Sequence, residues 1–244
     1  MKHILILSAN PKDTSPLRLD EEIREIEEGL KRSQHRDQFE LTAKGAVRLH
    51  DFYRHMLEVQ PQIVHFCGHG HGEQGLVLED EVGHYQFLQT EQLAAMFKLF
   101  AAKGLECVLL NACYSEAQAT AINQSIPYVI GMNQAIGDKA AIKFAVAFYD
   151  TLGAGESVTF AFDLAKIQLM GLQEDLKPVL LTNTEAIAKL NKSDSESDRK
   201  ITPQKIPTET KPETDRKNTV TIEMKTGDHG KQIAYIERVE NMTF

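Results

Sequence analysis

The chain has 244 residues, a formal net charge of −8 and 42% hydrophobic residues, which is enough for one large domain with a sizeable core. The negative charge and the scattered Lys and Arg residues argue against a nucleic-acid-binding surface. We identify no apolar run near the roughly 20 residues that a membrane-spanning helix needs. Three cysteines, an odd number, do not suit a disulfide framework, so we expect free thiols and a cytoplasmic location.

Apolar runs alternate with amphipathic segments along the first 185 residues. Short aliphatic runs predict buried strands, and apolar residues repeating every three or four positions predict helices. Two short apolar runs on either side of a Gly-containing acidic turn predict a hairpin. The order of these elements predicts an α/β fold: a three-layer sandwich with an open, mostly parallel sheet and helices on both faces. The predicted strands are 4–7, 39–47, 63–66, 107–110, 128–131 and 178–181, the helices 19–32, 52–59, 90–103, 116–123, 139–152 and 158–170, and the hairpin 76–78 with 85–87.

The composition changes after the predicted core, which ends near residue 190. Residues 191–218 are rich in Ser, Pro and charged residues and contain no aromatic residue, which predicts a disordered linker. Residues 219–244 again alternate apolar and polar positions. We expect a flexible tail that ends in a short β-prone segment, which either packs on its own domain 1–190 or recruits another chain.

Two predicted strands end in reactive side chains. The first leads into Cys67-Gly68-His69-Gly70 and the second into Asn111-Ala112-Cys113-Tyr114-Ser115. Ligands of open α/β sheets bind beyond the carboxyl ends of the strands. Cys113 also precedes a predicted helix, and the amino end of a helix is a position where reactive cysteines occur. We therefore interpret Cys113 as a nucleophile and His69 as its general base, with the backbone amides of Gly70 and Cys113 forming an oxyanion hole.

Other interpretations of these residues are weaker. Cys67 and Cys107 lie within predicted strands, so we expect them in the core. Residues 70–75 match the dinucleotide-binding pattern G-x-G-x-x-G, but a strand follows where a phosphate-binding helix is required. Four alternating residues could face a metal, but consecutive alternate positions fit a tetrahedral zinc site poorly; they are His65, Cys67, His69 and His71. We therefore expect neither a metal nor a cofactor.

The residues around Cys113, and the order of His69 and Cys113 along the chain, distinguish between classes of cysteine enzyme. A phosphatase loop needs Arg six positions after its cysteine, where this chain has Ala119. In glutamine amidotransferase-like folds the base follows the cysteine, whereas here only His229, beyond the linker, follows Cys113. A histidine that precedes its cysteine on successive core strands therefore favours a different class of enzyme.

The motifs of this chain resemble the CHAT domain, one of the caspase-like cysteine peptidases. The resemblance rests on residues 65–70, 75–80, 108–115 and 129–142, and it covers about residues 2–185. It implies a caspase-haemoglobinase fold and a His69–Cys113 dyad that cleaves peptides through an acyl-enzyme without a required third residue. It also implies an effector in bacterial signalling or defence that a partner activates. One departure is Cys67, where many relatives carry Ser.

Charge in the substrate pocket sets the P1 preference of caspase-like enzymes. Asp80, Glu116 and Asp138 would make the pocket acidic and select Lys or Arg in a peptide substrate. Asp138 also fits a helix N-cap, because an apolar helical pattern begins just after it. We expect recruitment of an activating partner, or self-assembly, through residues 219–244. The alternative to an enzyme is a catalytically silent caspase-like scaffold whose tail carries the function.

Overall fold

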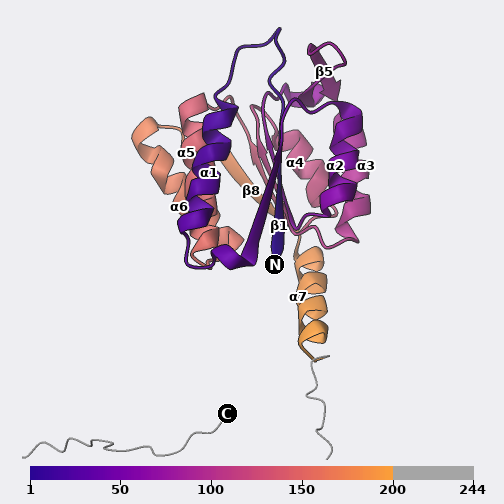
Figure 1. Cartoon of the computed structure of the whole chain (residues 1–244), viewed down its shortest axis with the longest axis vertical. Helices are drawn as coiled ribbons and strands as arrows, with labels where there is room; N and C mark the ends of the chain where they lie inside the picture. The colour runs from indigo at the N-terminus through magenta and orange to yellow at the C-terminus, as the bar shows by residue number, and fades with distance from the viewer. Residues whose placement is uncertain (200–244) are drawn as a thin grey trace, which may run out of the picture. The chain divides into compact units, whose positions relative to one another are not determined.

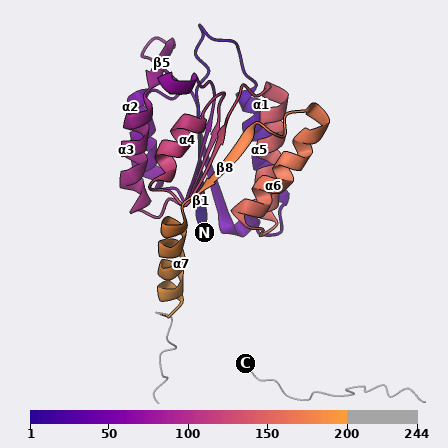
Figure 2. The same ribbon diagram turned by 180° about the vertical axis from the view of Figure 1, so that it is seen from behind.

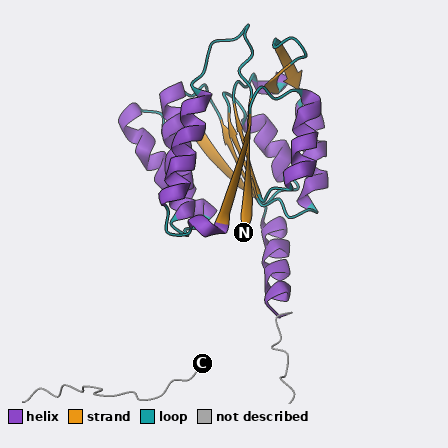
Figure 3. Ribbon diagram, viewed as in Figure 1, coloured by secondary structure: helices purple, strands orange, loops and turns teal. Residues whose placement is uncertain are grey.

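The computed structural model describes residues 1–199, with side chains up to residue 192. A central sheet of strand order β2-β1-β3-β6-β7-β8 lies between two layers of helices (Figures 1 and 3). Neighbouring strands are parallel except for β8, which runs antiparallel to β7. The predicted three-layer α/β sandwich is therefore confirmed. The strands are β1 (Lys2–Ser8), β2 (Phe39–Lys44), β3 (Ile63–Cys67), β6 (Cys107–Asn111), β7 (Tyr128–Met132) and β8 (Pro178–Thr182).

The helices divide between the two faces of the sheet, as the opposite views of Figures 1 and 2 show. Side chains alternate across each strand: Leu5 and Leu7 face one helical layer, and Ile4 and Ile6 face the other. Because helices cover both faces of the sheet, the strands are continuous apolar runs in the sequence. One layer contains α1 (Leu19–Arg32), α5 (Asp138–Gly153) and α6 (Val158–Leu169); the other contains α2 (Leu49–Val59), α3 (Thr90–Ala101) and α4 (Glu116–Asn123). Short 3-10 helices occur at Arg36–Gln38, Gly72–Gln74 and Met170–Leu172.

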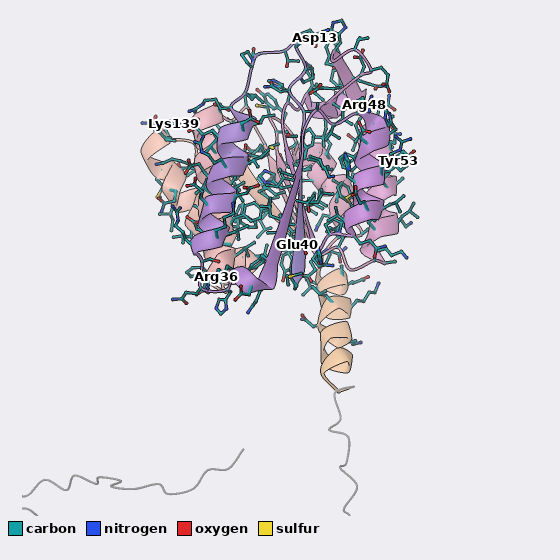
Figure 4. The ribbon with its side chains drawn as sticks, viewed as in Figure 1. Asp13, Arg36, Glu40, Arg48, Tyr53 and Lys139 are labelled. Carbon is teal, nitrogen blue, oxygen red and sulfur yellow. The ribbon has the colours of Figure 1, made fainter. Side chains whose placement is uncertain are left out.

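The loop of residues 9–18 and a small hairpin lie together at the carboxyl end of β1. The hairpin pairs β4 (Leu76–Glu79) with β5 (Tyr85–Leu88) in antiparallel fashion, as predicted. The Lys12 amide donates a hydrogen bond to the Gly83 carbonyl at 3.0 Å, and the Tyr85 amide donates to Asp13 at 3.0 Å. Figure 4 shows Asp13 at the outer end of this loop. These two hydrogen bonds attach the loop of residues 9–18 to the turn of the hairpin and to the start of β5.

The end of the described chain differs from the sequence prediction. Helix α7 spans Thr184–Arg199, so helical structure continues into residues 191–199, where the composition suggested a disordered linker. Asn183 starts this helix, because its side-chain oxygen accepts a hydrogen bond from the Ala186 amide at 3.0 Å. Once a helix has started, each further polar residue extends it at little cost. The predictions for residues 200–218 and 219–244 lie outside the described residues.

Between residues 1 and 199, no helix combines the length and the apolar character that crossing a membrane requires.

Candidate active site

Strands β3 and β6 place His69 and Cys113 at the same edge of the sheet. Cys67 and Asn111, which end these strands, are register partners, and each reactive residue lies two positions further along its chain. Both residues line one small cavity of about 30 Å³. The structure therefore brings the two predicted residues to a common site. The other residues that line this cavity are Leu17, Leu19, Glu22, Gly68, Asn111, Ala112, Ile136, Asp138 and Ala141.

A backbone carbonyl holds the imidazole ring of His69. The Nε2 atom lies 2.8 Å from the carbonyl oxygen of Ser15, in the loop of residues 9–18. A carbonyl oxygen only accepts hydrogen bonds, so Nε2 must carry the hydrogen. In the neutral ring the lone pair is then on Nδ1, which is the tautomer that can accept a proton at that atom.

The segment that carries Cys113 has an unusual backbone and is fixed beyond the cysteine. Cys113 is partly exposed, and its Sγ lies 3.7 Å from the carbonyl oxygen of Ile136. Tyr114, the next residue, has a φ of 54°, a left-handed conformation that costs a non-glycine residue about 1 kcal/mol or more. The buried Ser115 hydroxyl donates to the Leu110 carbonyl at 3.0 Å and accepts from the Met132 amide at 3.0 Å. These bonds hold the strained turn before α4.

Gly70 packs directly against the cysteine segment. A Cβ atom at this position would overlap with the carbonyl oxygen of Cys113, so only glycine lets the two loops approach this closely. The contact explains why a glycine follows His69. It also places the main chain of Gly70 beside that of Cys113, the two residues whose amides were predicted to form an oxyanion hole.

The other two thiols are buried in the core, as predicted. Burial raises the pKa of Cys67 well above its ordinary value, and the nearby Glu22 carboxylate raises it further. Burial also raises the pKa of Cys107 to about 12. Both cysteines are therefore protonated and inaccessible at neutral pH. This holds for Cys67 even though its sulfur lies close to a ring nitrogen of His65.

The four alternating residues considered for a metal do not converge. Donor atoms of His65 and Cys67 lie within 4.8 Å of each other and of Glu22, all three buried. His69 bonds to Ser15 instead. The ring of His71 packs edge-on against Phe87, with ring centroids 5.9 Å apart. Strand β3 ends at Cys67, so the alternation that keeps His65 and Cys67 on one face of the sheet does not extend to the two loop histidines.

The three acidic candidates for a substrate pocket occupy different places. Asp138 lines the cavity with His69 and Cys113. Asp80 turns into its own loop, where it accepts hydrogen bonds from the His84 amide at 2.8 Å and the Val82 amide at 2.9 Å; the first of these chiefly lowers its pKa. Glu116 begins α4 and is not among the residues that line the cavity. The structure brings only Asp138 to the candidate site.

The interpretation of Asp138 as a helix N-cap is wrong. Helix α5 begins at Asp138 itself, the cap position is Gly137, and no side chain caps this helix end. The Asp138 carboxylate instead accepts a hydrogen bond from Nε of Arg18 at 2.7 Å. A guanidinium offers a stronger, charged donor than the first-turn amides, so the side chain turns toward the segment that precedes α1.

Sequence reasoning missed Glu22 as a residue of the site. This glutamate is 3% exposed, and its Oε1 accepts a hydrogen bond from Nδ2 of Asn111 at 2.6 Å. A signal for it existed in the helical pattern. Glu22 is three residues after Leu19 and four before Ile26, which places a carboxylate within the apolar stripe that faces the sheet.

The sheet order, the flanking helices, and a histidine loop and a cysteine loop at neighbouring strand ends define an α/β sandwich with a candidate His–Cys site at the carboxyl edge of its sheet. The CHAT domain family matches residues 2–195, so this chain belongs to the CHAT family. The fold of this chain is similar to that of a secreted C11 cysteine protease from Bacteroides thetaiotaomicron in complex with an irreversible peptide inhibitor. The TM-score is 0.54 with 13% sequence identity, over 77% of this chain and 68% of that one.

Two curated relatives are named as proteases. A "Probable protease" from Gillisia limnaea is 26% identical over 156 residues, and a "Roc-COR-CHAT protease" from an unknown prokaryotic organism is 27% identical over 166 residues. The matches cover 64% and 66% of this chain but only 28% and 16% of those proteins. The chain therefore corresponds to a minor part of each of them.

Proposed function

We propose that this chain is a cysteine endopeptidase in which His69 and Cys113 form the catalytic dyad. The observation that carries the proposal is the cavity that both residues line beyond the ends of two adjacent parallel strands. Membership of the CHAT family supports the reaction class. The pair His65 and Cys67 does not serve this role, because both side chains are completely buried and a substrate cannot reach them.

The hydrogen bond at Ser15 supports proton transfer through one ring nitrogen of His69, Nδ1. With Nε2 bonded to the Ser15 carbonyl, Nδ1 of His69 accepts the thiol proton of Cys113. The thiolate attacks the scissile carbonyl carbon, and the backbone amides of Gly70 and Cys113 stabilise the resulting oxyanion. The C–N bond then breaks as Nδ1–H protonates the leaving amine. Water, deprotonated by Nδ1, hydrolyses the thioester and restores the thiol.

The charge of the cavity favours a cationic P1 side chain. Two carboxylates line it, those of Asp138 and Glu22, whereas no Lys or Arg does. At about 30 Å³ it has the volume of a single water molecule, so a Lys or Arg side chain enters only after the wall at residues 17–19 moves. The Arg18 guanidinium that now pairs with Asp138 would be exchanged for that of the substrate.

This requirement for movement fits an effector that a partner activates. We place the chain in bacterial signalling or defence, working in the cytoplasm as its three free thiols suggest. Residues 219–244 would recruit the activating partner or a second copy. Activation would raise the fraction of molecules in which the wall at residues 17–19 is open, above a basal fraction in which the chain alone admits and cleaves a peptide slowly.

Peptide cleavage tests this function. The purified full-length chain is incubated with a peptide library that varies P1, and the new termini are identified by mass spectrometry. The proposal expects cleavage that disappears in Cys113→Ala and falls by about 10²-fold or more in His69→Ala. Cleavage that persists in Cys113→Ala contradicts it and would leave a caspase-like scaffold as the alternative for this chain.

A further inference from the structure

We propose that Glu22 is a positioning residue for Cys113 and acts through the side chain of Asn111. This inference rests on the proposed peptidase function and deepens the account of its site. The two side chains come from different layers of the fold: Glu22 from α1, and Asn111 from the end of β6. Their hydrogen bond, 2.6 Å from Nδ2 to Oε1, is buried.

Asn111 is one of two polar residues that flank the reactive cysteine at equal spacing. Ser115, two residues after Cys113, is bonded to β6 and β7 through its hydroxyl. Asn111, two residues before Cys113, donates to Glu22 and also to the Ala141 carbonyl of α5 at 3.1 Å. The cysteine thus lies in a short segment that is held at both ends. Because Tyr114 within it has a left-handed conformation, the segment needs such bonds to keep its shape.

Glu22 is itself held firmly enough to position a neighbour. Its carboxylate is 3% exposed, and Oε1 also lies 3.2 Å from Nε2 of His65, although without hydrogen-bond geometry. The His65 ring stacks on Tyr149, with centroids 5.7 Å apart. A carboxylate with such surroundings has few alternative positions, so the bond to Asn111 transmits the position of α1 to the cysteine segment.

The same short stretch of chain also reaches the other parts of the site. The Ser15 carbonyl holds His69, and Arg18 holds Asp138. Glu22 follows one helical turn later and holds Asn111. The segment Ser15–Glu22 therefore contacts both sides of the catalytic cavity, which gives any movement of α1 a direct effect on the distance between His69 and Cys113.

An exchange of hydrogen-bond donor and acceptor tests the inference. Asn111→Asp removes the donor and sets two carboxylates against each other, so we expect kcat to fall by about tenfold or more with little change in KM. Adding Glu22→Gln to this variant restores the bond in the reverse direction, because the Gln amide donates to the Asp carboxylate. We expect the double variant to recover kcat to within about threefold of the wild type. Glu25→Gln, one turn further along α1, where the half-exposed carboxylate pairs with Arg24, is the matched control and should change neither constant.

Two further measurements keep a loss of fold and a loss of function apart. All rates are taken at least 15 °C below the melting temperature of each variant, so that the folded fraction does not limit them. The rate of Cys113 alkylation by iodoacetamide reports the position of the thiol without any substrate, and it should follow the same pattern as kcat. If wild-type protein shows no cleavage that depends on Cys113, the proposed function fails, whereas the alkylation series still tests the Glu22–Asn111 pair. An Asn111→Asp variant that is folded and has wild-type alkylation and kcat overturns the inference, and so does a double variant that recovers neither.

Discussion

The Ser15 carbonyl oxygen lies 2.8 Å from Nε2 of His69, and this one contact determines which nitrogen of the ring can act as a base. The acceptor is a main-chain oxygen, so the side chain of Ser15 takes no part in this hydrogen bond. We therefore expect Ser15→Ala to leave kcat/KM within about twofold of the wild type, as for other exposed substitutions. Inserting a glycine before Ser15 shifts the carbonyl and should lower kcat by about 10²-fold. Steady-state kinetics of both variants check this, and a large loss in Ser15→Ala would contradict it.

Thiol reactivity in the native chain should be confined to one residue. At pH 8, burial keeps Cys67 and Cys107 protonated, since both have raised pKa values, that of Cys107 about 12. We expect iodoacetamide to add one carbamidomethyl group, at Cys113, and three after denaturation in guanidinium chloride, one for each cysteine of the chain. Intact-mass and peptide mass spectrometry read out the result. Native modification of Cys67 as fast as that of Cys113 would show that β3 opens readily.

The close approach of Gly70 to the Cys113 carbonyl predicts that the smallest side chain is damaging there. Gly70→Ala should lower stability by about 1–3 kcal/mol through overpacking and lower kcat by about 10²-fold through displacement of the dyad. Gly171→Ala is the control, because nothing lies within 4 Å of a Cβ at that position. Thermal melts and kinetics of the two variants should differ clearly. Equal behaviour would mean that the two loops separate easily.

Only one of the three predicted pocket acids should govern P1 choice. Asp138 lines the cavity, whereas Asp80 and Glu116 lie outside it. In Asp138→Asn, the ratio of kcat/KM for P1 Arg over P1 Gln should fall by about tenfold or more. Asp80→Asn and Glu116→Gln should leave this ratio unchanged, even where Asp80→Asn weakens its loop. A fall of equal size in either of these two would move the P1 pocket away from the cavity.

The fold was predictable because the strands of this chain are continuous apolar runs and its helices have apolar residues at a regular spacing of three and four. The continuous run Ile4–Leu7 indicates a strand with both faces covered, and the spacing from Leu19 to Leu30 indicates a helix. The end of α7 was not predictable from composition, because a polar run such as residues 191–199 can have the same composition whether it extends a helix or forms a linker.

The candidate site was predictable where it depends on strand order and not where it depends on partners across space. Parallel strands bring His69 and Cys113 to one edge, whatever their packing. No local pattern signals the bond of Arg18 to Asp138, because the two residues are 120 positions apart in the chain. The carbonyl that bonds to His69 is likewise 54 positions away, so no local pattern reveals it. The glutamate at position 22 was visible as a charge within an apolar stripe, but its partner Asn111 was not.

The most direct test of the dyad is the covalent adduct formed with an electrophilic peptide ketone that carries Arg at P1. The account predicts one adduct, mapped to the Sγ of Cys113, that is absent in Cys113→Ala and forms at least about 10²-fold more slowly in His69→Ala. An adduct on Cys67 or Cys107, or an adduct on Cys113 that forms at the same rate without His69, would contradict it.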